Sequence, residues 1–403
     1  MNAENKKSEG YVATGLPVEY RGEYGQIIDL GLAANPSGAA FDAKKLADLT
    51  STKQIAEYDE DVHHSDIKDL LIEGIGLKNI GNESVIFHPN GSYGAGDEVI
   101  RALSNHSHQQ GKTLTVYVPT YSFPNVEQYA ARNNARYVPV ISDKSFLQSD
   151  SLNAVLDMKS NQLSGNVVYV DYPNNPSGVA NKDLLRKVVN HVSFHGGIPF
   201  VDLAFGEVLG DEFKDGIQYT IDRGGVCVGS LTKTQGLAAL RAGYILMNPG
   251  LSKNLYSKGE KLVFGLPAHV KNAYTLLFTG SEGKTLARAQ ALKAINYNHQ
   301  TNSKLYEALT NLGLKIAPTI YETPVQIVAN ANDDLFTRLA CVGIKSESLN
   351  EYSNTLGKEA SKGYGNQAVR ILTPRVGMLE ETIKRFRVAM QLTDNHIQSK
   401  AKK

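Results

Sequence analysis

The sequence predicts an α/β protein in which a mostly parallel β-sheet is covered by helices on both faces, with a smaller α+β domain beside it. Three observations predict this class. Strand-like runs alternate with helix-like runs through most of the chain. The strand-like runs are almost uniformly apolar, as in sheets that are buried on both faces. Near the end, a long helical stretch gives way to short alternating strands and helices.

The expected strands of the main sheet are apolar runs that end in turn residues. They lie at 85–87, 113–123, 135–140, within 166–178, at 198–208 and at 224–231. Runs with apolar residues at helical spacing separate them. These expected helices lie at 41–49, 65–76, 97–103, 125–135 and 183–196, and the glycine-rich stretch before residue 97 is expected to be a turn.

The 403 residues exceed what one hydrophobic core usually organises, so two domains are expected. A long helix over Ala287–Leu309 leads out of the first domain, and a last helix begins near Met378. The expected division is an N-terminal arm at 1–26, a small domain at 27–60 and 288–403, and a large domain at 61–287.

The composition excludes several classes of protein. Lys and Arg number 42 against 41 Asp and Glu, which gives no electrostatic reason to expect nucleic acid or an anionic membrane as a partner. No apolar run is long enough to span a bilayer, and the N-terminal residues lack the apolar core of a signal peptide. Cys227 and Cys341 lack metal-ligand spacing, so we expect no metal site and a reducing, cytoplasmic compartment.

Polar side chains follow the apolar strands at several points. Tyr121, Asn175, Asp202 and Lys233 all lie at or just past an expected strand end. In parallel sheets ligands bind beyond the carboxyl ends of the strands. The sequence therefore predicts that these four residues share one site.

The stretch GSLTKTQGLAALRAGY (229–244) contains the polar anchors Ser230, Lys233 and Arg241. A lysine amine condenses with an aldehyde, while serine and arginine hold a phosphate, so the stretch suits a covalently anchored phosphate cofactor. A surface loop with two solvated cations is the alternative. The glycine-rich stretch after the strand at 85–87 could likewise be an anion site at a helix start or merely a turn.

Together the motifs NGSYGAG, PTY, NNPSG, DLAF and SLTK followed by Arg241 occur in an order and spacing that resembles a known family. The chain is similar to class I/II aminotransferases of the aspartate aminotransferase fold group, histidinol-phosphate aminotransferase among them, over about residues 27–395. The resemblance implies fold-type I, a mostly parallel seven-stranded sheet, and pyridoxal 5′-phosphate as cofactor.

The resemblance also implies roles for the residues at the strand ends. Lys233 would form the internal aldimine and then act as general acid and base at the substrate Cα. Asp202 would pair with the pyridinium nitrogen. Asn175 would bind the phenolic oxygen of the ring and lie near the substrate, and Tyr121 would stack on the ring. The alternatives are a solvated strand-end Asp202, a plain turn residue at 175 and a core tyrosine at 121.

A phosphate site is implied by a second group of residues. Gly91, Ser92 and Tyr93 match the phosphate loop of the family, and Ser230 and Arg241 complete it. Tyr58 matches a tyrosine that reaches the phosphate of the neighbouring subunit, which implies a homodimer with shared active sites. A surface tyrosine is the alternative for Tyr58.

Two further positions bear on the substrate and the reaction. Arg370 matches the arginine that grips the substrate α-carboxylate, with Arg375 as its rival. Phe205 stands at a cofactor contact where the family usually has a tyrosine, so one hydrogen-bond donor to the cofactor is missing. The expected effect is about 1.5–3 kcal/mol on that contact.

The function implied is a transaminase. It would move an amino group between an L-amino acid, or an amino-acid-like amine, and a 2-oxo acid by ping-pong kinetics. The Phe205 departure favours the alternative of a lyase, decarboxylase or cyclase on the same fold. A third class is a binding protein that holds the cofactor without turnover.

Overall fold

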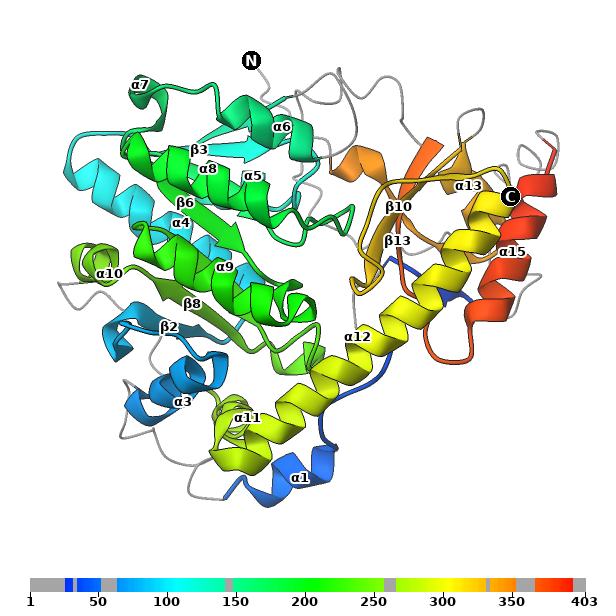
Figure 1. The fold of residues 1–403 in the computed structure, drawn as a ribbon, viewed down its shortest axis with the longest axis horizontal. Helices are drawn as coiled ribbons and strands as arrows, with labels where there is room; N and C mark the ends of the chain where they lie inside the picture. Colours follow the sequence, from blue (N-terminus) through cyan, green and yellow to red (C-terminus); the bar gives the residue numbers. More distant parts are fainter. Residues whose placement is uncertain are drawn as a thin grey trace, which may run out of the picture.

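The computed structural model describes residues 26–31, 35–51, 64–141, 148–256, 266–330, 334–352 and 367–393. Within these segments the chain forms two units, and the long helix α12 (Gly280–Asn311) runs from one to the other (Figure 1). The larger unit contains a seven-stranded sheet, and the smaller unit contains a four-stranded sheet. The site described below lies where these two units face each other.

The larger sheet has the strand order β2-β8-β7-β6-β5-β3-β4. Its strands are β2 (Val85–His88), β3 (Thr115–Pro119), β4 (Arg136–Val140), β5 (Val167–Asp171), β6 (Ile198–Asp202), β7 (Val226–Ser230) and β8 (Gly243–Met247). Only β8 runs antiparallel to its neighbours β2 and β7. The prediction of a mostly parallel sheet is confirmed, although the sequence analysis did not assign β8 as a strand.

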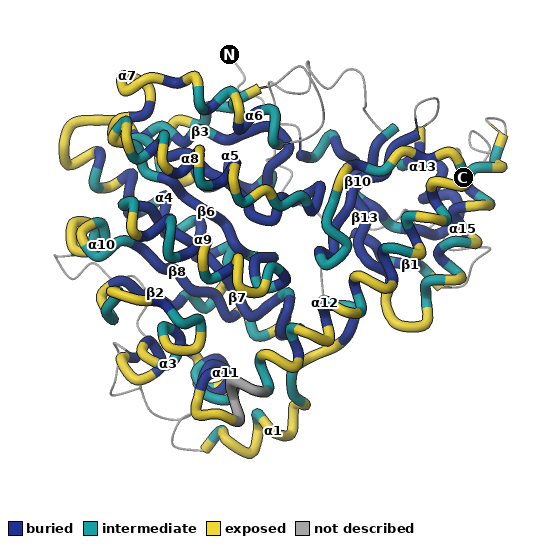
Figure 2. Tube along the Cα trace, in the orientation of Figure 1, coloured by how far each residue is buried: buried dark blue, intermediate teal, exposed yellow. Residues whose placement is uncertain are grey.

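Helices cover this sheet on both faces because successive side chains of each strand point to opposite sides. Val168 and Val170 of β5 pack into a core shared with one set of helices, and Val167 and Tyr169 pack into the core on the other face. Figure 2 shows the strands as buried and the outer sides of the helices as exposed. The first set is α3 (Ser65–Ile75), α6 (Gln148–Val155), α8 (Lys182–Phe194), α9 (Asp211–Asp222) and α11 (Ala268–Phe278), and the second is α4 (Gly91–Gln109), α5 (Val126–Arg132) and α10 (Pro249–Tyr256).

Helix α4 begins at Gly91, six residues before the expected start at Asp97. The prediction of a glycine-rich turn was therefore wrong, because NGSYGAG forms the first turns of the helix. A Cβ on Gly94 would lie 2.3 Å from the His88 ring, and one on Gly96 would lie 3.0 Å from the Tyr129 ring. These glycines allow close packing of a helix rather than breaking it.

The smaller unit contains an antiparallel sheet in the order β12-β13-β10-β9. Its strands are β9 (Lys315–Ile316), β10 (Val325–Ala329), β12 (Glu347–Ser348) and β13 (Ala368–Leu372). Helices α12, α13 (Leu335–Cys341) and α15 (Leu379–Gln391) pack on it through one apolar core. The alternating short strands and helices of this region, and the last helix near Met378, were predicted.

The expected small-domain range 27–60 is split between the two units. Strand β1 (Ile28–Asp29) pairs in parallel with β11 (Ile344–Lys345) of the smaller unit. Helix α1 (Ala43–Asp48) instead contacts α11, and the Asn272 side chain donates to the Leu49 carbonyl at 3.2 Å.

The remaining short helices are α7 (Ser160–Leu163) and the 3-10 turns Asn82–Ser84, Gly206–Leu209, Ala238–Leu240 and Leu349–Glu351. Among the helices of the described segments, none combines the length and the apolarity that crossing a membrane requires.

Candidate functional site

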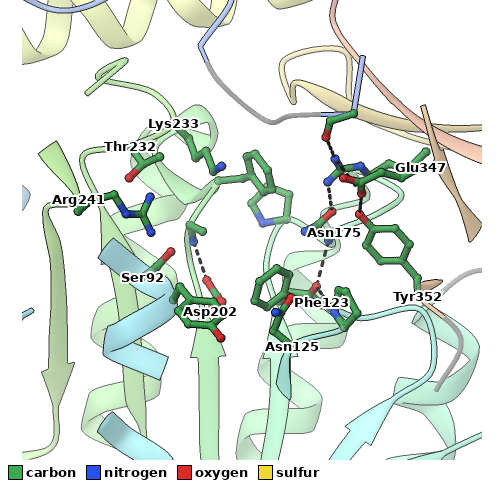
Figure 3. Close-up of a pocket in the computed structure, with 18 residues that line it drawn as sticks. Ser92, Phe123, Asn125, Asn175, Asp202, Thr232, Lys233, Arg241, Glu347 and Tyr352 are labelled. Carbon is green, nitrogen blue, oxygen red and sulfur yellow. Dashed lines mark hydrogen bonds and ion pairs between the residues drawn. The ribbon is translucent and has the colours of Figure 1, made fainter. Parts of the chain in front are cut away.

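A cavity of about 320 Å³ opens at the carboxyl ends of β5, β6 and β7, between the two units. Figure 3 shows that its side chains come from both sheets and point toward a common space. The lining residues are Gly31, Ser92, Tyr93, Phe123, Pro124, Asn125, Asp171, Pro173, Asn175, Asp202, Ala204, Phe205, Thr232, Lys233, Arg241, Glu347, Tyr352 and Arg370.

Asp202 is the last residue of β6, so the strand delivers its carboxylate into the cavity. Burial raises the pKa of Asp202 to about 6, against hydrogen bonds that lower it. These bonds come from the Ala204 amide to Oδ1 at 2.9 Å and from the Tyr169 hydroxyl to Oδ2 at 2.9 Å. At neutral pH the cavity therefore contains a largely ionised carboxylate in a site shielded from water.

Lys233 follows β7 and places its ammonium group in the same cavity. Burial and the nearby cations Arg370 and Arg241 lower the pKa of Lys233 to about 8, although Glu347 and Asp202 oppose the shift. A lysine of this kind carries far more neutral amine at neutral pH than an ordinary lysine does. Neutral amine is the reactive form toward an aldehyde.

Arg241 lies at one end of the cavity, beside Ser92 and Thr232 (Figure 3). It is exposed, and its Nη2 donates to the Asn90 carbonyl at 3.1 Å. Ser92 belongs to the first turn of the 19-residue helix α4, where backbone amides and the helix dipole favour an anion. A guanidinium, two hydroxyls and a helix start together suit a phosphate.

At the Arg241 end of the cavity, two segments of backbone approach each other closely, and this approach requires glycine. Gly91 has φ +65°, and its backbone amide donates to the Arg241 carbonyl at 2.6 Å. A Cβ on Gly91 would lie 3.1 Å from Arg241 Nη2, and a Cβ on Gly243 would lie 2.2 Å from the Gly91 carbonyl carbon. Larger residues would push α4 away from Arg241.

Arg370 lies at the opposite end and is buried, with 4% of its surface exposed. Its Nη2 is 3.0 Å from Oε2 of Glu347 and also donates to the Gly31 carbonyl. Nη1 donates to Oδ1 of Asn175 at 3.2 Å, and the Tyr352 hydroxyl donates to Glu347. The guanidinium is thus held by acceptors of this chain, one of them a full negative charge.

Asp171 is the last residue of β5, and its carboxylate accepts hydrogen bonds from two loops of the site. Its Oδ2 accepts from the backbone amides of Phe123 at 3.0 Å and Asn175 at 3.1 Å. Its Oδ1 accepts from the Asn174 side chain at 3.1 Å. The sequence analysis missed Asp171, although an acidic residue that ends a wholly apolar strand was a visible signal.

The predicted residues Lys233, Asp202, Asn175, Arg241, Arg370, Ser92, Tyr93 and Phe205 all line the cavity. Gly91 lies behind Arg241 rather than among the lining residues. Arg375, the rival of Arg370, is exposed and does not line the cavity. Tyr58 lies outside the described residues.

Two further predicted residues do not line the cavity, and a near neighbour of each does so instead. Tyr121 adopts φ +60° and packs in an apolar cluster with Ile327 and Tyr352, whereas Phe123 lines the cavity. Ser230 is buried at the end of β7, where its Oγ accepts from the Thr232 amide, and Thr232 lines the cavity. In each case the side chain that lines the cavity is two residues further along the chain than the predicted one.

Residues 26–337 match the family model described as aminotransferase class I and II. A histidinol-phosphate aminotransferase of Methanopyrus kandleri is 26% identical over 59% of this chain and 60% of its own length. An LL-diaminopimelate aminotransferase of Bacteroides thetaiotaomicron is 24% identical over 62% of this chain and 64% of its own length. The alignments thus span less than two thirds of these curated relatives.

Solved structures share the fold over nearly the whole chain. A double mutant of Thermus thermophilus aspartate aminotransferase superposes with a TM-score of 0.72 at 16% identity, covering 90% of this chain and 91% of the other. A histidinol-phosphate aminotransferase of Sinorhizobium meliloti in complex with pyridoxal-5′-phosphate gives a TM-score of 0.65 at 17% identity, covering 96% and 99%.

Proposed function

The chain belongs to the class I and II aminotransferase family, and from this we propose that it is a pyridoxal-phosphate-dependent aminotransferase. It would transfer an amino group from an amine or amino acid to a carbonyl acceptor such as a 2-oxo acid, in two half-reactions. One observation carries the proposal: Lys233 and Arg241, from the stretch 229–244, and Asp202, from the end of β6, converge on a single cavity.

The residues of the cavity fit this cofactor. Arg241, Ser92 and Thr232 would hold its phosphate, because they offer a guanidinium and two hydroxyls beside a helix start. Asp202, a buried carboxylate between the two arginines, would pair with the ring nitrogen. Phe123 offers a flat apolar side chain for the ring face, the role that the sequence analysis gave to Tyr121.

Pyridoxal phosphate, when bound, supplies an aldehyde that condenses with primary amines and a ring that withdraws electrons from the carbon bearing the amine. Lys233 would provide the amine that anchors the aldehyde. With a substrate amine bound in its place, Nζ of Lys233 could take a proton from the substrate carbon and return it. A pKa of about 8 suits this work, because the group can exist in either form near neutral pH.

Asp202 carries a negative charge at neutral pH. With a pKa of about 6 it is mainly ionised at neutral pH, so it can hold a proton on the ring nitrogen. The hydrogen bonds from Tyr169 and the Ala204 amide fix its two oxygens. Asn175, at the turn after β5, remains our candidate for the ring oxygen and the substrate.

Arg370 is the candidate for a substrate carboxylate, as the family resemblance implies. Its present acceptors include Glu347 and Asn175, so a carboxylate that bound through the same nitrogens would compete with them.

The proposal is tested with purified protein, added pyridoxal phosphate and a panel of amino donors. We expect the absorbance of the bound aldehyde form to convert to that of pyridoxamine phosphate, and a carbonyl acceptor to reverse the change. Lys233→Ala should lose this conversion by about 10³-fold or more, since it removes both anchor and proton carrier. A holoprotein that never forms pyridoxamine phosphate with any donor would refute the proposal.

A lyase or decarboxylase is the second candidate, favoured by Phe205. This side chain lines the cavity, with Nζ of Lys233 5.5 Å from its ring centre, and it offers no hydroxyl to the cofactor. Release of CO₂, or of ammonia without an acceptor, would identify this chemistry.

We further propose a homodimer with shared active sites, in which Tyr58 reaches the phosphate site of the neighbouring subunit, and a cytoplasmic location. Both rest on the family resemblance and the cysteine content. Light scattering on the purified protein tests the dimer. Loss of cofactor affinity in Tyr58→Phe would support the shared site, and a monomer in solution would exclude it.

A further inference from the structure

The ion pair at the Arg370 end of the cavity is built into the sheet. Glu347 of β12 and Arg370 of β13 are direct cross-strand partners in the antiparallel register. Their side chains meet with Nη2 3.0 Å from Oε2, and the side chains of Arg370 and Glu347 are 5% and 15% exposed respectively. The backbone pairing therefore places the carboxylate and the guanidinium side by side on one face of the sheet.

The same pair uses Nη2, one of the nitrogens through which Arg370 could bind a substrate carboxylate. A carboxylate binds arginine best through two parallel N–H bonds. Nη2 already donates to Glu347 and to the Gly31 carbonyl, and Nη1 donates to Asn175. A carboxylate that bound through Nη2 would therefore have to displace an acceptor of the chain itself.

Tyr352 also contacts both members of the Glu347–Arg370 ion pair. Its hydroxyl donates to Glu347, and its ring centre lies 5.6 Å from the Arg370 guanidinium carbon. Glu347 is therefore fixed by a hydroxyl and a guanidinium together. A second carboxylate placed next to it would meet a like charge in a partly buried site, where such repulsion is poorly screened.

We propose that Glu347 determines the substrate class of this cavity. Because it already compensates Arg370, the site favours primary amines, and their carbonyl products, that carry no carboxylate on the reacting carbon. This inference rests on the proposed amino-transfer function. The donor R–CHX–NH₂, in which X is hydrogen or hydroxymethyl, becomes R–CO–X while the acceptor R′–CO–X becomes R′–CHX–NH₂, so the donor loses the two electrons that the acceptor gains.

Three donors with one skeleton test this directly: L-phenylalanine, L-phenylalaninol and 2-phenylethylamine. They differ only in bearing a carboxylate, a hydroxymethyl group or hydrogen on the reacting carbon. We measure kcat/KM of the donor half-reaction from the cofactor absorbance. The wild-type protein should favour the last two, and Glu347→Gln should raise kcat/KM for L-phenylalanine by about 10- to 100-fold, the value of a charge-assisted hydrogen bond.

A binding measurement gives a readout that is independent of turnover. The probe is 3-phenylpropionate, which has the carboxylate but no amine, titrated into the holoprotein by calorimetry. Glu347→Gln should tighten its binding by a similar factor. Tyr352→Phe, which loosens Glu347 without removing it, should give a smaller change in the same direction and keeps the test valid if Glu347→Gln folds poorly.

Glu351→Gln is the matched control. Glu351 lies four residues further along the chain, is half-buried and senses both Glu347 and Arg370, but it does not line the cavity. Its removal should change the donor ratio by less than about threefold.

The outcomes separate this inference from the proposed function. If amines react and Glu347→Gln admits L-phenylalanine, the inference stands. If the wild-type holoprotein already prefers L-phenylalanine and Glu347→Gln changes neither the donor ratio nor 3-phenylpropionate binding, it fails while the aminotransferase proposal survives. If no donor converts the cofactor, the proposed function fails first.

Discussion

The two arginines of the cavity lie at opposite ends and differ in their exposure and in the charges around them. Arg241 is exposed, its guanidinium donates to a neutral carbonyl, and no carboxylate of the described residues forms an ion pair with it. Arg370 is 4% exposed and is compensated by Glu347. Arg241 is our candidate for binding an anion, whereas Arg370 already pairs with a carboxylate. Residue type alone therefore does not identify an anion site, because the surrounding charges decide it.

The sharpest test of this comparison is cofactor affinity. Arg241→Met should weaken pyridoxal phosphate binding by about 10- to 100-fold, since a charge-assisted bond to phosphate is lost. Arg370→Met combined with Glu347→Gln should leave that affinity nearly unchanged. The double change avoids a buried carboxylate without a partner, which would destabilise the fold. Equal losses at both ends, measured by fluorescence titration of the apoprotein, would remove the distinction.

The close backbone approach behind Arg241 gives a second test. Gly243→Ala would place a Cβ 2.2 Å from the Gly91 carbonyl carbon, so α4 or β8 must shift. We expect a loss of about 1–3 kcal/mol in the free energy of unfolding, measured in urea, as for other overpacked sites. Cofactor affinity should fall in parallel. Gly313→Ala is a suitable contrast, since its Cβ would meet no atom within 4 Å and only its φ of +79° is unfavourable.

Both arginines lower the pKa of Lys233, and the pH dependence of its reaction with pyridoxal phosphate measures this effect. Its pKa of about 8 results from burial first, then from Arg370 and Arg241, with Glu347 and Asp202 opposing. Only neutral amine reacts, so the rate of pyridoxal phosphate capture by the apoprotein should rise about tenfold per pH unit and level off near pH 8. A bend near the value of an ordinary lysine would contradict this. Arg370→Met combined with Glu347→Gln should move the bend to higher pH, because Arg370 lowers this pKa by more than Glu347 raises it.

The smallest expected effect concerns Asp202, between the two ends. Tyr169→Phe removes a hydrogen bond that lowers the pKa of Asp202, so that pKa should rise above about 6. Since the ionised form is required, the acid limb of the pH–rate profile should move to higher pH by up to about one unit. Tyr172→Phe is the control, because its hydroxyl donates to Glu212, which does not line the cavity. An unchanged acid limb in Tyr169→Phe would mean that Asp202 does not set it.

Much of the fold was predictable because its signals are local. The uniformly apolar strands predicted a parallel sheet covered on both faces, and β5, β6 and β7 lie where those runs predicted them. Strand β8 was missed although Tyr244–Met247 is as apolar as the other strands, and only its antiparallel pairing follows from contacts with β2 and β7 rather than from its own pattern. The start of α4 was missed because glycines that permit close packing look, in sequence, like glycines that form a turn.

The sequence by itself determined the family and the positions of Lys233, Asp202 and Arg241, because each follows a strand or lies in a motif whose spacing is local. The tertiary structure alone decided that Phe123 rather than Tyr121 lines the cavity, since this depends on how the loop after β3 turns. It also decided that Glu347 faces Arg370. These residues are separated by 23 positions in the chain, and only the register of β12 against β13 brings the two charges together.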